Sequence, residues 1–283
     1  MPEAPEGTGA VQGKVALITG AARGQGRSHA VRLAQEGADI IAVDLCGSVD
    51  TVGYPLATAD DLAQTVDLVK EAGGRIVAAE ADVRDLDALS AAVARGVEEL
   101  GRLDIVCANA GILTMGMSHE LSEEQWRTIV DINLTGAWHT SKVATPYLIG
   151  QGEGGVLIFT SSTMGLKGGP FASAYSATKH GIVGLAKSLA MELAQFRIRS
   201  NVLHPTTVRS PMIDNPVTLK SFRPDLEAPT SDDATPILQM LNLINEPWIE
   251  AGAVSEAVLY LSSKAGENIT GISLPIDLGA AAK

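Results

Sequence analysis

Short apolar runs alternate along the chain with longer segments whose apolar residues recur at the 3.6-residue period of an amphipathic helix. The apolar runs, rich in Val, Ile and Ala as buried parallel strands are, occupy residues 14–19, 39–44, 75–80, 103–107, 155–160, 198–203 and 272–276. The helical segments occupy residues 27–36, 60–73, 86–100, 122–149, 173–193 and 252–262. This alternation predicts an α/β fold, a doubly wound, seven-stranded parallel sheet with helices on both faces. Pro275 favours an edge position for the last strand.

Two segments interrupt the alternation. Residues 45–59 have neither helical nor strand periodicity, and they are longer than the connections of about 2–6 residues that usually join strands to helices. They are either a functional loop beside a ligand site or a tolerated surface insertion. Residues 206–250 contain repeated prolines together with Met212, Phe222 and Trp248. We interpret them as an apolar substrate lid, with an irregular loop as the alternative.

The composition is that of an ordinary globular protein and argues against some classes of partner. Of the 283 residues, 46% are hydrophobic and 19% are charged, and the formal net charge is −12. Such an acidic balance argues against nucleic acid as a partner. No apolar run approaches the roughly 18 residues of a membrane span, so no membrane partner is expected. Cys46 and Cys107 are too few for a disulfide framework, and both are expected to serve in packing.

The N-terminal residues are acidic, contain Pro and Gly, and lack the basic and apolar regions of a signal peptide. We therefore expect a flexible arm at residues 1–12 and a cytoplasmic protein. The remaining residues, 13–283, suit a single domain.

A glycine-rich turn follows the first apolar run, in the stretch Thr19-Gly-Ala-Ala-Arg-Gly-Gln-Gly26. Gly20 permits a tight turn, while Gly24 and Gly26 let the backbone approach a pyrophosphate and let the helix pack on the strand. The N-terminus of that helix offers free N–H groups to a phosphate. Asp44 ends the second apolar run, where a carboxylate can accept hydrogen bonds from a ribose. This order of elements is that of the dinucleotide-binding unit of a single-domain Rossmann fold.

Asp44 and Arg23 favour different cofactors. A carboxylate at Asp44 repels the 2′-phosphate of NADP and so favours NAD, whereas an arginine in the glycine turn suits a phosphate. We give more weight to Asp44, because its expected contact with the ribose is direct. NAD is therefore the predicted cofactor, with NADP as the alternative. No metal is expected.

Tyr175 and Lys179 lie four residues apart in a helical segment, so a helix places both on one face. The pKa of a phenol is about 10, and a nearby ammonium lowers it because the ammonium stabilises the phenolate. A phenol tuned in this way can take a proton from an alcohol or give one to a carbonyl oxygen. The same pair occurs by chance on surface helices, so its surroundings matter. Asn109, Ser162 and Pro205 follow strand ends, as the glycine turn does, and such ends converge on one cleft.

The order and spacing of these residues resemble the classical short-chain dehydrogenase/reductase (SDR) family along nearly the whole chain. The matching motifs are the glycine turn, Asp82, Asn109-Ala-Gly111, Asn133, Ser162, Tyr175-x-x-x-Lys179 and Pro205. The resemblance implies that Tyr175 is the general acid/base and that Ser162 holds the substrate oxygen. It further implies that Lys179 lowers the pKa of the tyrosine and binds the nicotinamide ribose, and that Asn133 helps to hold a water in a proton relay.

Motif and resemblance together assign the residues around the cofactor. The predicted set is Gly20, Arg23, Gly24, Gln25, Gly26, Asp44, Leu45, Asp82, Val83, Asn109, Ala110, Gly111, Tyr175, Lys179, Pro205 and Val208. Two positions depart from the family pattern, since Ala108 stands where the family usually has Asn and Thr206 where it usually has Gly. Val208 is still expected to offer its backbone to the nicotinamide amide. Ser161 is expected to be structural.

The insertion at 45–59, the departure at Thr206 and the ending Leu274-Pro-Ile-Asp-Leu-Gly279 look like the carveol-dehydrogenase-like subgroup associated with mycofactocin. This resemblance implies tightly held NAD, covered by the insertion, with mycofactocin as an external electron carrier. We therefore expect hydride transfer between NAD and a secondary alcohol or its ketone, with an apolar terpenoid or steroid alcohol favoured by the lid. A homotetramer is the family expectation. The alternatives are an ordinary NADP-dependent carbonyl reductase and a nonenzymatic NAD-sensing scaffold.

Overall fold

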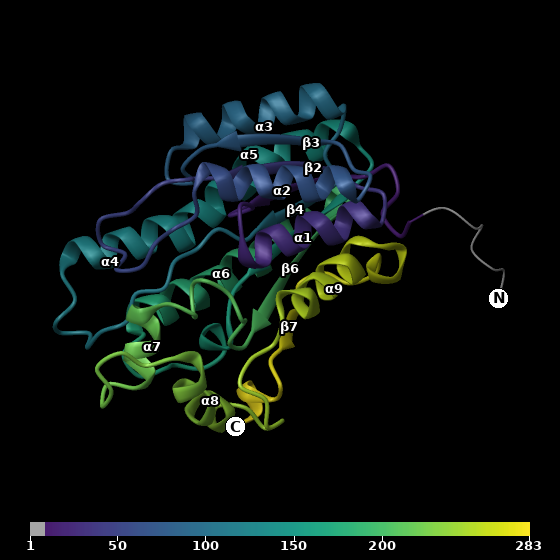
Figure 1. Ribbon diagram of the computed structural model, residues 1–283. Coiled ribbons are helices and arrows are strands. Elements are labelled where there is room, and N and C mark those ends of the chain that lie inside the picture. The colour runs from purple at the N-terminus through teal and green to yellow at the C-terminus, as the bar shows by residue number, and fades with distance from the viewer. Residues whose placement is uncertain (1–8) are drawn as a thin grey trace.

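The fold is given by a computed structural model that describes residues 9–283 (Figure 1). Residues 1–8 of the predicted N-terminal arm lie outside the described residues. The remainder of that arm packs against the domain: Val11 is 2% exposed, and its N–H donates to the Glu36 carbonyl oxygen over 3.2 Å. Residues 9–12 therefore belong to the folded domain, because Val11 is buried at its edge. Within residues 9–283 no helix is long and apolar enough to cross a membrane.

Seven parallel strands form one sheet in the order β3-β2-β1-β4-β5-β6-β7. Their bounds are β1 Val15–Thr19, β2 Asp39–Asp44, β3 Ile76–Glu80, β4 Ile105–Ala108, β5 Gly155–Thr160, β6 Ile198–Pro205 and β7 Ser273–Ile276. The predicted fold class is confirmed, and β7 with its proline is an edge strand as expected. The strand order reverses between β1 and β4, so the loops that follow these two strands diverge and leave a crevice at their carboxyl ends.

Helices cover both faces of the sheet (Figure 1). One face carries α1 (Gly24–Gln35), α2 (Ala59–Glu71) and α9 (Ala251–Ser262), and the other carries α3 (Leu86–Leu100), α5 (Gly136–Gln151) and α6 (Ser173–Glu192). Alternate residues of β1 serve the two layers: Ala16 and Ile18 join one buried cluster, whereas Val15 and Leu17 join the other. Burial on both faces explains why the strands are continuous apolar runs in the sequence.

The prediction of one helix over 122–149 is wrong in one respect. α4 (Glu123–Val130) and α5 are separated by a π-helical turn at Asp131–Thr135. A π-helical turn holds more residues than an α-helical one and is frequent at functional sites. Here it contains Asn133, which is fully buried and pairs with the backbone of Ile112.

The two interruptions of the sequence pattern have different structures. Residues 45–59 contain no helix or strand before α2 begins, as predicted. Residues 206–250 are more regular than predicted and contain α7 (Pro216–Phe222) and α8 (Ser231–Met240). Pro216 opens α7, because the first residue of a helix needs no N–H partner within the helix.

Candidate active site

The glycine turn joins β1 to α1 at the crevice. Gly20 and Gly24 have φ angles of 68° and 56°, a region that favours glycine. A Cβ atom on Gly26 would lie 2.0 Å from the Gly20 carbonyl oxygen, so only glycine allows this contact of helix and strand. In the part of the chain that the structure describes, no side chain caps the N-terminus of α1. Its first N–H groups are therefore free to bind an anion.

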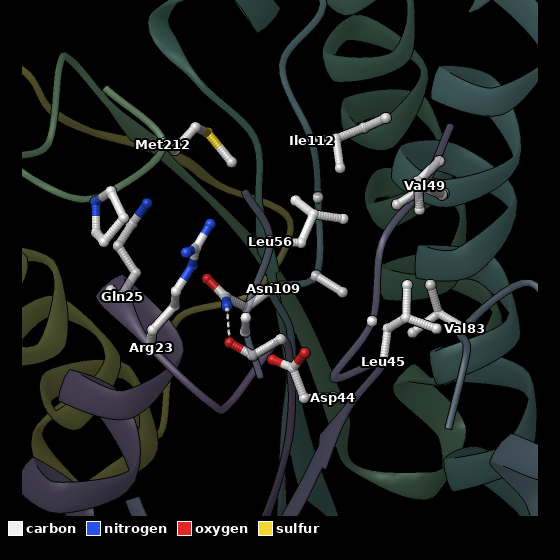
Figure 2. Close-up of a pocket in the computed structure, with 18 of the residues that line it drawn as sticks. Arg23, Gln25, Asp44, Leu45, Val49, Leu56, Val83, Asn109, Ile112 and Met212 are labelled. Carbon is white, nitrogen blue, oxygen red and sulfur yellow. Dashed lines mark hydrogen bonds between the residues drawn. The ribbon is translucent and has the colours of Figure 1, made fainter. Parts of the chain in front are cut away.

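Asp44 lies at the end of β2 beside the glycine turn (Figure 2). Its carboxylate oxygens accept hydrogen bonds from the N–H groups of Ala22 and Cys46, over 2.9 and 3.2 Å. These bonds fix the carboxylate at the crevice, and a carboxylate keeps further lone pairs for ribose hydroxyls. Its negative charge opposes a 2′-phosphate at the same place.

Two cavities meet at this edge of the sheet. The first, which we name the turn cavity, lies between the glycine turn and the 45–59 insertion (Figure 2). The predicted cofactor residues that line it are Gly20, Arg23, Gly24, Gln25, Asp44, Leu45, Asp82, Val83, Asn109, Ala110 and Gly111. Gly26 lies behind the turn and lines neither cavity.

The second cavity, the tyrosine cavity, lies beyond β5 and β6. The predicted residues that line it are Gln25, Asn109, Gly111, Ser162, Tyr175, Lys179, Pro205 and Val208. Gln25, Asn109 and Gly111 line both cavities, so the two are continuous. The structure therefore brings the predicted nucleotide-binding and catalytic residues into one site, apart from Gly26 and Asn133.

α6 presents Tyr175 and Lys179 to the tyrosine cavity from adjacent turns. The Lys179 Nζ lies 5.4 Å from the centre of the Tyr175 ring and donates to the carbonyl oxygen of Thr160, at the end of β5, over 2.8 Å. Ser162 is the second residue after β5, and it lines the same cavity as Tyr175. Ser161 is buried and its hydroxyl donates to the Lys179 carbonyl oxygen over 2.9 Å, which fits the structural role predicted for it.

The electrostatics of Tyr175 differ from the expectation that Lys179 lowers its pKa. Burial raises the pKa of Tyr175 to about 12, against a lowering effect of the Ser162 hydrogen bond, and the nearby Tyr54 raises it further. Burial also lowers the pKa of Lys179 to about 8. The predicted lowering of the phenol pKa is corrected here, because desolvation of the phenolate outweighs every other influence and the ammonium is bonded to a carbonyl oxygen instead.

The Asn133 side chain hydrogen-bonds to the backbone of Ile112 and lines neither cavity. Its Oδ1 accepts from the Ile112 N–H over 2.8 Å, and its Nδ2 donates to the Ile112 carbonyl oxygen over 3.0 Å. A Cβ on Gly111 would lie 3.3 Å from the Asn133 Oδ1 and 3.6 Å from the Lys179 Nζ. Asn133 therefore positions the loop after β4 that separates the two cavities, and its side-chain amide is already engaged there.

The backbone around Val208 is held by a bridge to Ile249. The Ile249 N–H donates to Thr207 and the Arg209 N–H donates to Ile249, each over 2.9 Å. In such a parallel bridge the N–H and C=O of Val208 itself point away from Ile249. Within residues 9–283 those two groups have no hydrogen-bond partner, and Val208 lines the tyrosine cavity. The departure from the family pattern at Thr206 leaves the predicted backbone contact sterically available.

The 45–59 insertion is fastened to both walls of the turn cavity. The Arg23 guanidinium donates to the Pro55 carbonyl oxygen over 2.7 Å on one side, and the Leu113 N–H donates to the Tyr54 hydroxyl over 3.0 Å on the other. Val49 and Tyr54 are 8% and 6% exposed. The insertion is therefore an ordered wall of the turn cavity.

Sequence reasoning missed Tyr54, although an aromatic residue is a signal in a chain with 4% aromatics. It also missed Ala280, which is 3% exposed and lines the tyrosine cavity. A small residue near the end of the chain carries no local signal of such a place.

A parallel sheet with a nucleotide-binding turn and an adjoining serine, tyrosine and lysine defines a class, the nucleotide-dependent oxidoreductases. Residues 14–218 match the family model described as short chain dehydrogenase. The chain belongs to the short-chain dehydrogenase family, as the resemblance indicated.

The chain is similar to characterised and solved members over nearly its whole length. A (-)-trans-carveol dehydrogenase from Rhodococcus erythropolis is 52% identical over 274 residues, which cover 96% of this chain and 99% of the relative. A crystal structure of carveol dehydrogenase from Mycobacterium avium in complex with NAD has a TM-score of 0.96 at 51% identity and covers 98% and 100% of the two chains. A short chain dehydrogenase from Mycobacterium paratuberculosis bound to NAD has a TM-score of 0.89 at 40% identity and covers 97% and 100%.

Proposed function

We propose that this protein transfers a hydride between NAD and a secondary alcohol or its ketone. The observation that carries the proposal is the convergence of Ser162, Tyr175 and Lys179 on a cavity that continues into the turn cavity. The retention of the complete set speaks against a nonenzymatic NAD-sensing scaffold, which could afford to lose Ser162.

The donor set at the glycine turn fits NAD. Asp44 suits an unphosphorylated ribose, and the guanidinium of Arg23 is engaged with Pro55, which leaves it less available for a 2′-phosphate. NAD is bound in both similar crystal structures, which confirms the predicted cofactor. When bound, NAD supplies the hydride acceptor and the positive charge of the oxidised nicotinamide. An NADP-dependent reductase is therefore the weaker alternative.

The residues of the tyrosine cavity manage the proton. The hydroxyls of Ser162 and Tyr175 bind the substrate oxygen, and Tyr175 takes the alcohol proton during oxidation or returns it during reduction. With a pKa raised to about 12 the phenol is protonated at neutral pH, so it is ready to donate to a carbonyl oxygen. For oxidation, positive charge that gathers near the phenol must lower its pKa, and the Lys179 ammonium contributes to that charge.

We propose an apolar substrate such as a terpenoid or steroid alcohol. The apolar residues that line the tyrosine cavity include Ile112, Leu113, Met115, Met164, Met212, Ile213, Phe222 and Leu241, and its lining within residues 9–283 contains no Asp or Glu. A cavity of this kind rewards burial of hydrocarbon surface. The name of the carveol dehydrogenase relative supports a terpenoid alcohol.

We further propose that NAD is held tightly and is reoxidised in place by an external carrier such as mycofactocin. The support is the insertion, which is fastened at Pro55 and Tyr54 to opposite walls of the turn cavity. Purified protein is expected to keep NAD(H) through desalting. Protein that loses its cofactor and turns over freely with added NAD would refute this part of the proposal.

We also propose that the protein is a homotetramer and lies in the cytoplasm. On α6 a Cβ at Gly184 would meet nothing within 4 Å, and Met191 is 76% exposed, so this helix leaves room for a neighbouring helix. Light scattering is expected to give the mass of four chains, and a monomer would contradict the assembly.

The activity is tested with a library of alcohols and an artificial electron acceptor, with and without added NAD. Oxidation of apolar secondary alcohols without added NAD is the expected result. Cofactor binding without turnover of any alcohol or ketone would favour the scaffold, and tighter binding of NADPH than NADH would favour the reductase.

A further inference from the structure

The C-terminal tail, residues 277–283, returns from β7 to the reaction site. In Figure 1 the chain ends beside α8, at the lid side of the molecule. Ala280 in this tail is 3% exposed, and its atoms form part of the wall of the tyrosine cavity. The tail therefore joins the loop after β5 and the lid among the parts of the chain that line this cavity.

Asp277 shapes the tail. Its two carboxylate oxygens accept hydrogen bonds from the N–H groups of Gly279 and Ala281, over 3.0 and 2.7 Å. Hydrogen bonds to an ionised carboxylate are stronger than neutral ones. Asp277 thereby folds the following residues into the short helical turn Ala280–Ala282 that carries Ala280.

The tail is bound to the end of the lid by backbone contacts. The Leu278 carbonyl oxygen accepts from the N–H groups of Leu243 and Ile244, both over 3.0 Å. Gly279 has a φ of 80°, and a Cβ there would lie 2.9 Å from the Leu243 side chain. A tail with this sequence fits closely against the residues that follow α8.

The tail is also bound to the loop after β5. The Lys167 ammonium donates to the Ala280 carbonyl oxygen, and Lys167 lines the tyrosine cavity together with Ser162. The tail is thus held from two sides, at Ala280 by the loop that carries Ser162 and at Leu278 by the lid. A larger side chain at the buried position of Ala280 cannot extend into solvent, so it must occupy part of the cavity.

We propose that the tail is a specificity-determining element and that Ala280 sets the size of substrate accepted at this end of the cavity. The inference rests on the proposed function, since it concerns the alcohol that enters beside Tyr175. The tail also positions the lid, through the hydrogen bonds that the Leu278 carbonyl oxygen accepts from it.

The test compares Ala280→Phe with Ala282→Phe, because Ala282 lies in the same turn but is exposed. For a bulky apolar alcohol, Ala280→Phe is expected to lower kcat/KM about tenfold or more, since misfit in an apolar pocket commonly changes it by roughly 10–200-fold. For a small secondary alcohol the change is expected to stay below about twofold. Ala282→Phe is expected to leave both values unchanged. Equal losses for both alcohols, or the same shift in selectivity in Ala282→Phe, would overturn the proposal.

Hydrogen exchange tests the link to the lid without any turnover. Asp277→Asn replaces one accepting oxygen by a donor, so the amides of Leu243 and Ile244 are expected to exchange about tenfold faster than in the wild type. Unchanged exchange at both amides would overturn the positioning role. A wild type that oxidises no alcohol would defeat the proposed function, yet this exchange measurement would still decide whether the tail positions the lid.

Discussion

The insertion at 45–59 and the lid at 206–250 both cover the site, and they are built in opposite ways. The insertion has no helix or strand, yet it is fastened to both walls of the turn cavity, and Val49 and Tyr54 in it are buried. The lid has two helices, yet Val217 and Met240 in it are 50% and 72% exposed. Regular secondary structure is therefore a poor guide to which cover stays closed.

The difference in exposure between the insertion and the lid follows from how each is packed on the rest of the domain. The insertion shares a buried cluster with Val83, Ile112 and Ile132. These residues lie in the segments after β3 and β4 and in the π-helical turn. The lid helices pack mainly on each other, through the small cluster of Leu219, Ala234 and Leu238. We infer that the insertion retains the cofactor while the lid opens for substrate, since local opening is easiest where few buried contacts are lost.

The largest expected effect is the loss of turnover when Tyr175 is replaced. Tyr175→Phe removes the proton donor and is expected to lower turnover by about 10²–10⁴-fold, the usual contribution of a general acid or base. The substitution leaves the attachments of the insertion at Pro55 and Tyr54 unchanged, so NAD retention is expected to stay near the wild-type level. Steady-state rates and the cofactor content after desalting measure both. Turnover near the wild-type rate would remove the catalytic assignment.

The lid side of the comparison is tested at Phe222, which lines the tyrosine cavity and packs on the lid cluster. Phe222→Ala is expected to lower kcat/KM for a bulky apolar alcohol by about 10–100-fold, because apolar contact is lost in the pocket. NAD retention is expected to be unaffected, and Phe222→Leu serves as the milder control. Faster loss of NAD in Phe222→Ala would show that the covers are not independent.

The insertion side is tested at Tyr54. Tyr54→Phe keeps the ring but removes the acceptor of the partly buried Leu113 N–H, and the lost hydrogen bond costs about 1 kcal/mol. Release of NADH is expected to be about tenfold faster, which its fluorescence reports in a stopped-flow measurement. Met240→Ala in α8 is the control, because Met240 is 72% exposed and lines neither cavity, and it should leave the release rate unchanged. An unchanged release rate in Tyr54→Phe would contradict the role of the insertion.

The smallest expected effect concerns the layer of α1 and α9, away from both covers. His29 in α1 is fully buried, its Nδ1 lies 2.8 Å from the hydroxyl oxygen of Ser255 in α9, and burial lowers its pKa from 6.5 to about 3. Below pH 6.5 the unfolded chain therefore binds a proton that the folded chain does not, so stability is full above this pH and falls as the pH decreases. At pH 6 the loss is about 1 kcal/mol.

Denaturant unfolding of the wild type and of His29→Gln at pH 7.5 and at pH 6, values about one unit above and half a unit below the ordinary histidine pKa, measures this loss. The variant is expected to lose the pH dependence assigned to His29, whatever its stability at the higher pH. An equal pH dependence in both proteins would assign the acid sensitivity to other groups.

Local sequence patterns determined the fold and most of the site. The seven apolar runs, the glycine turn and the Tyr175–Lys179 spacing each act within a few residues, where strand burial and helix geometry leave little choice. The convergence of strand ends then followed from the parallel topology. This is why Asp44, Ser162 and Val208 lie where the sequence predicted them.

Only the tertiary structure decided what joins segments that are distant in the chain. The pairing of Asn133 with Ile112, the bond between Tyr54 and Leu113, and the place of Ala280 in the cavity all depend on irregular loops that meet in space. The pKa of Tyr175 belongs to the same group. Spacing alone suggested a phenol with a lowered pKa, but the protonation of a side chain depends on how deeply the packed protein buries it, and here burial raises the pKa to about 12.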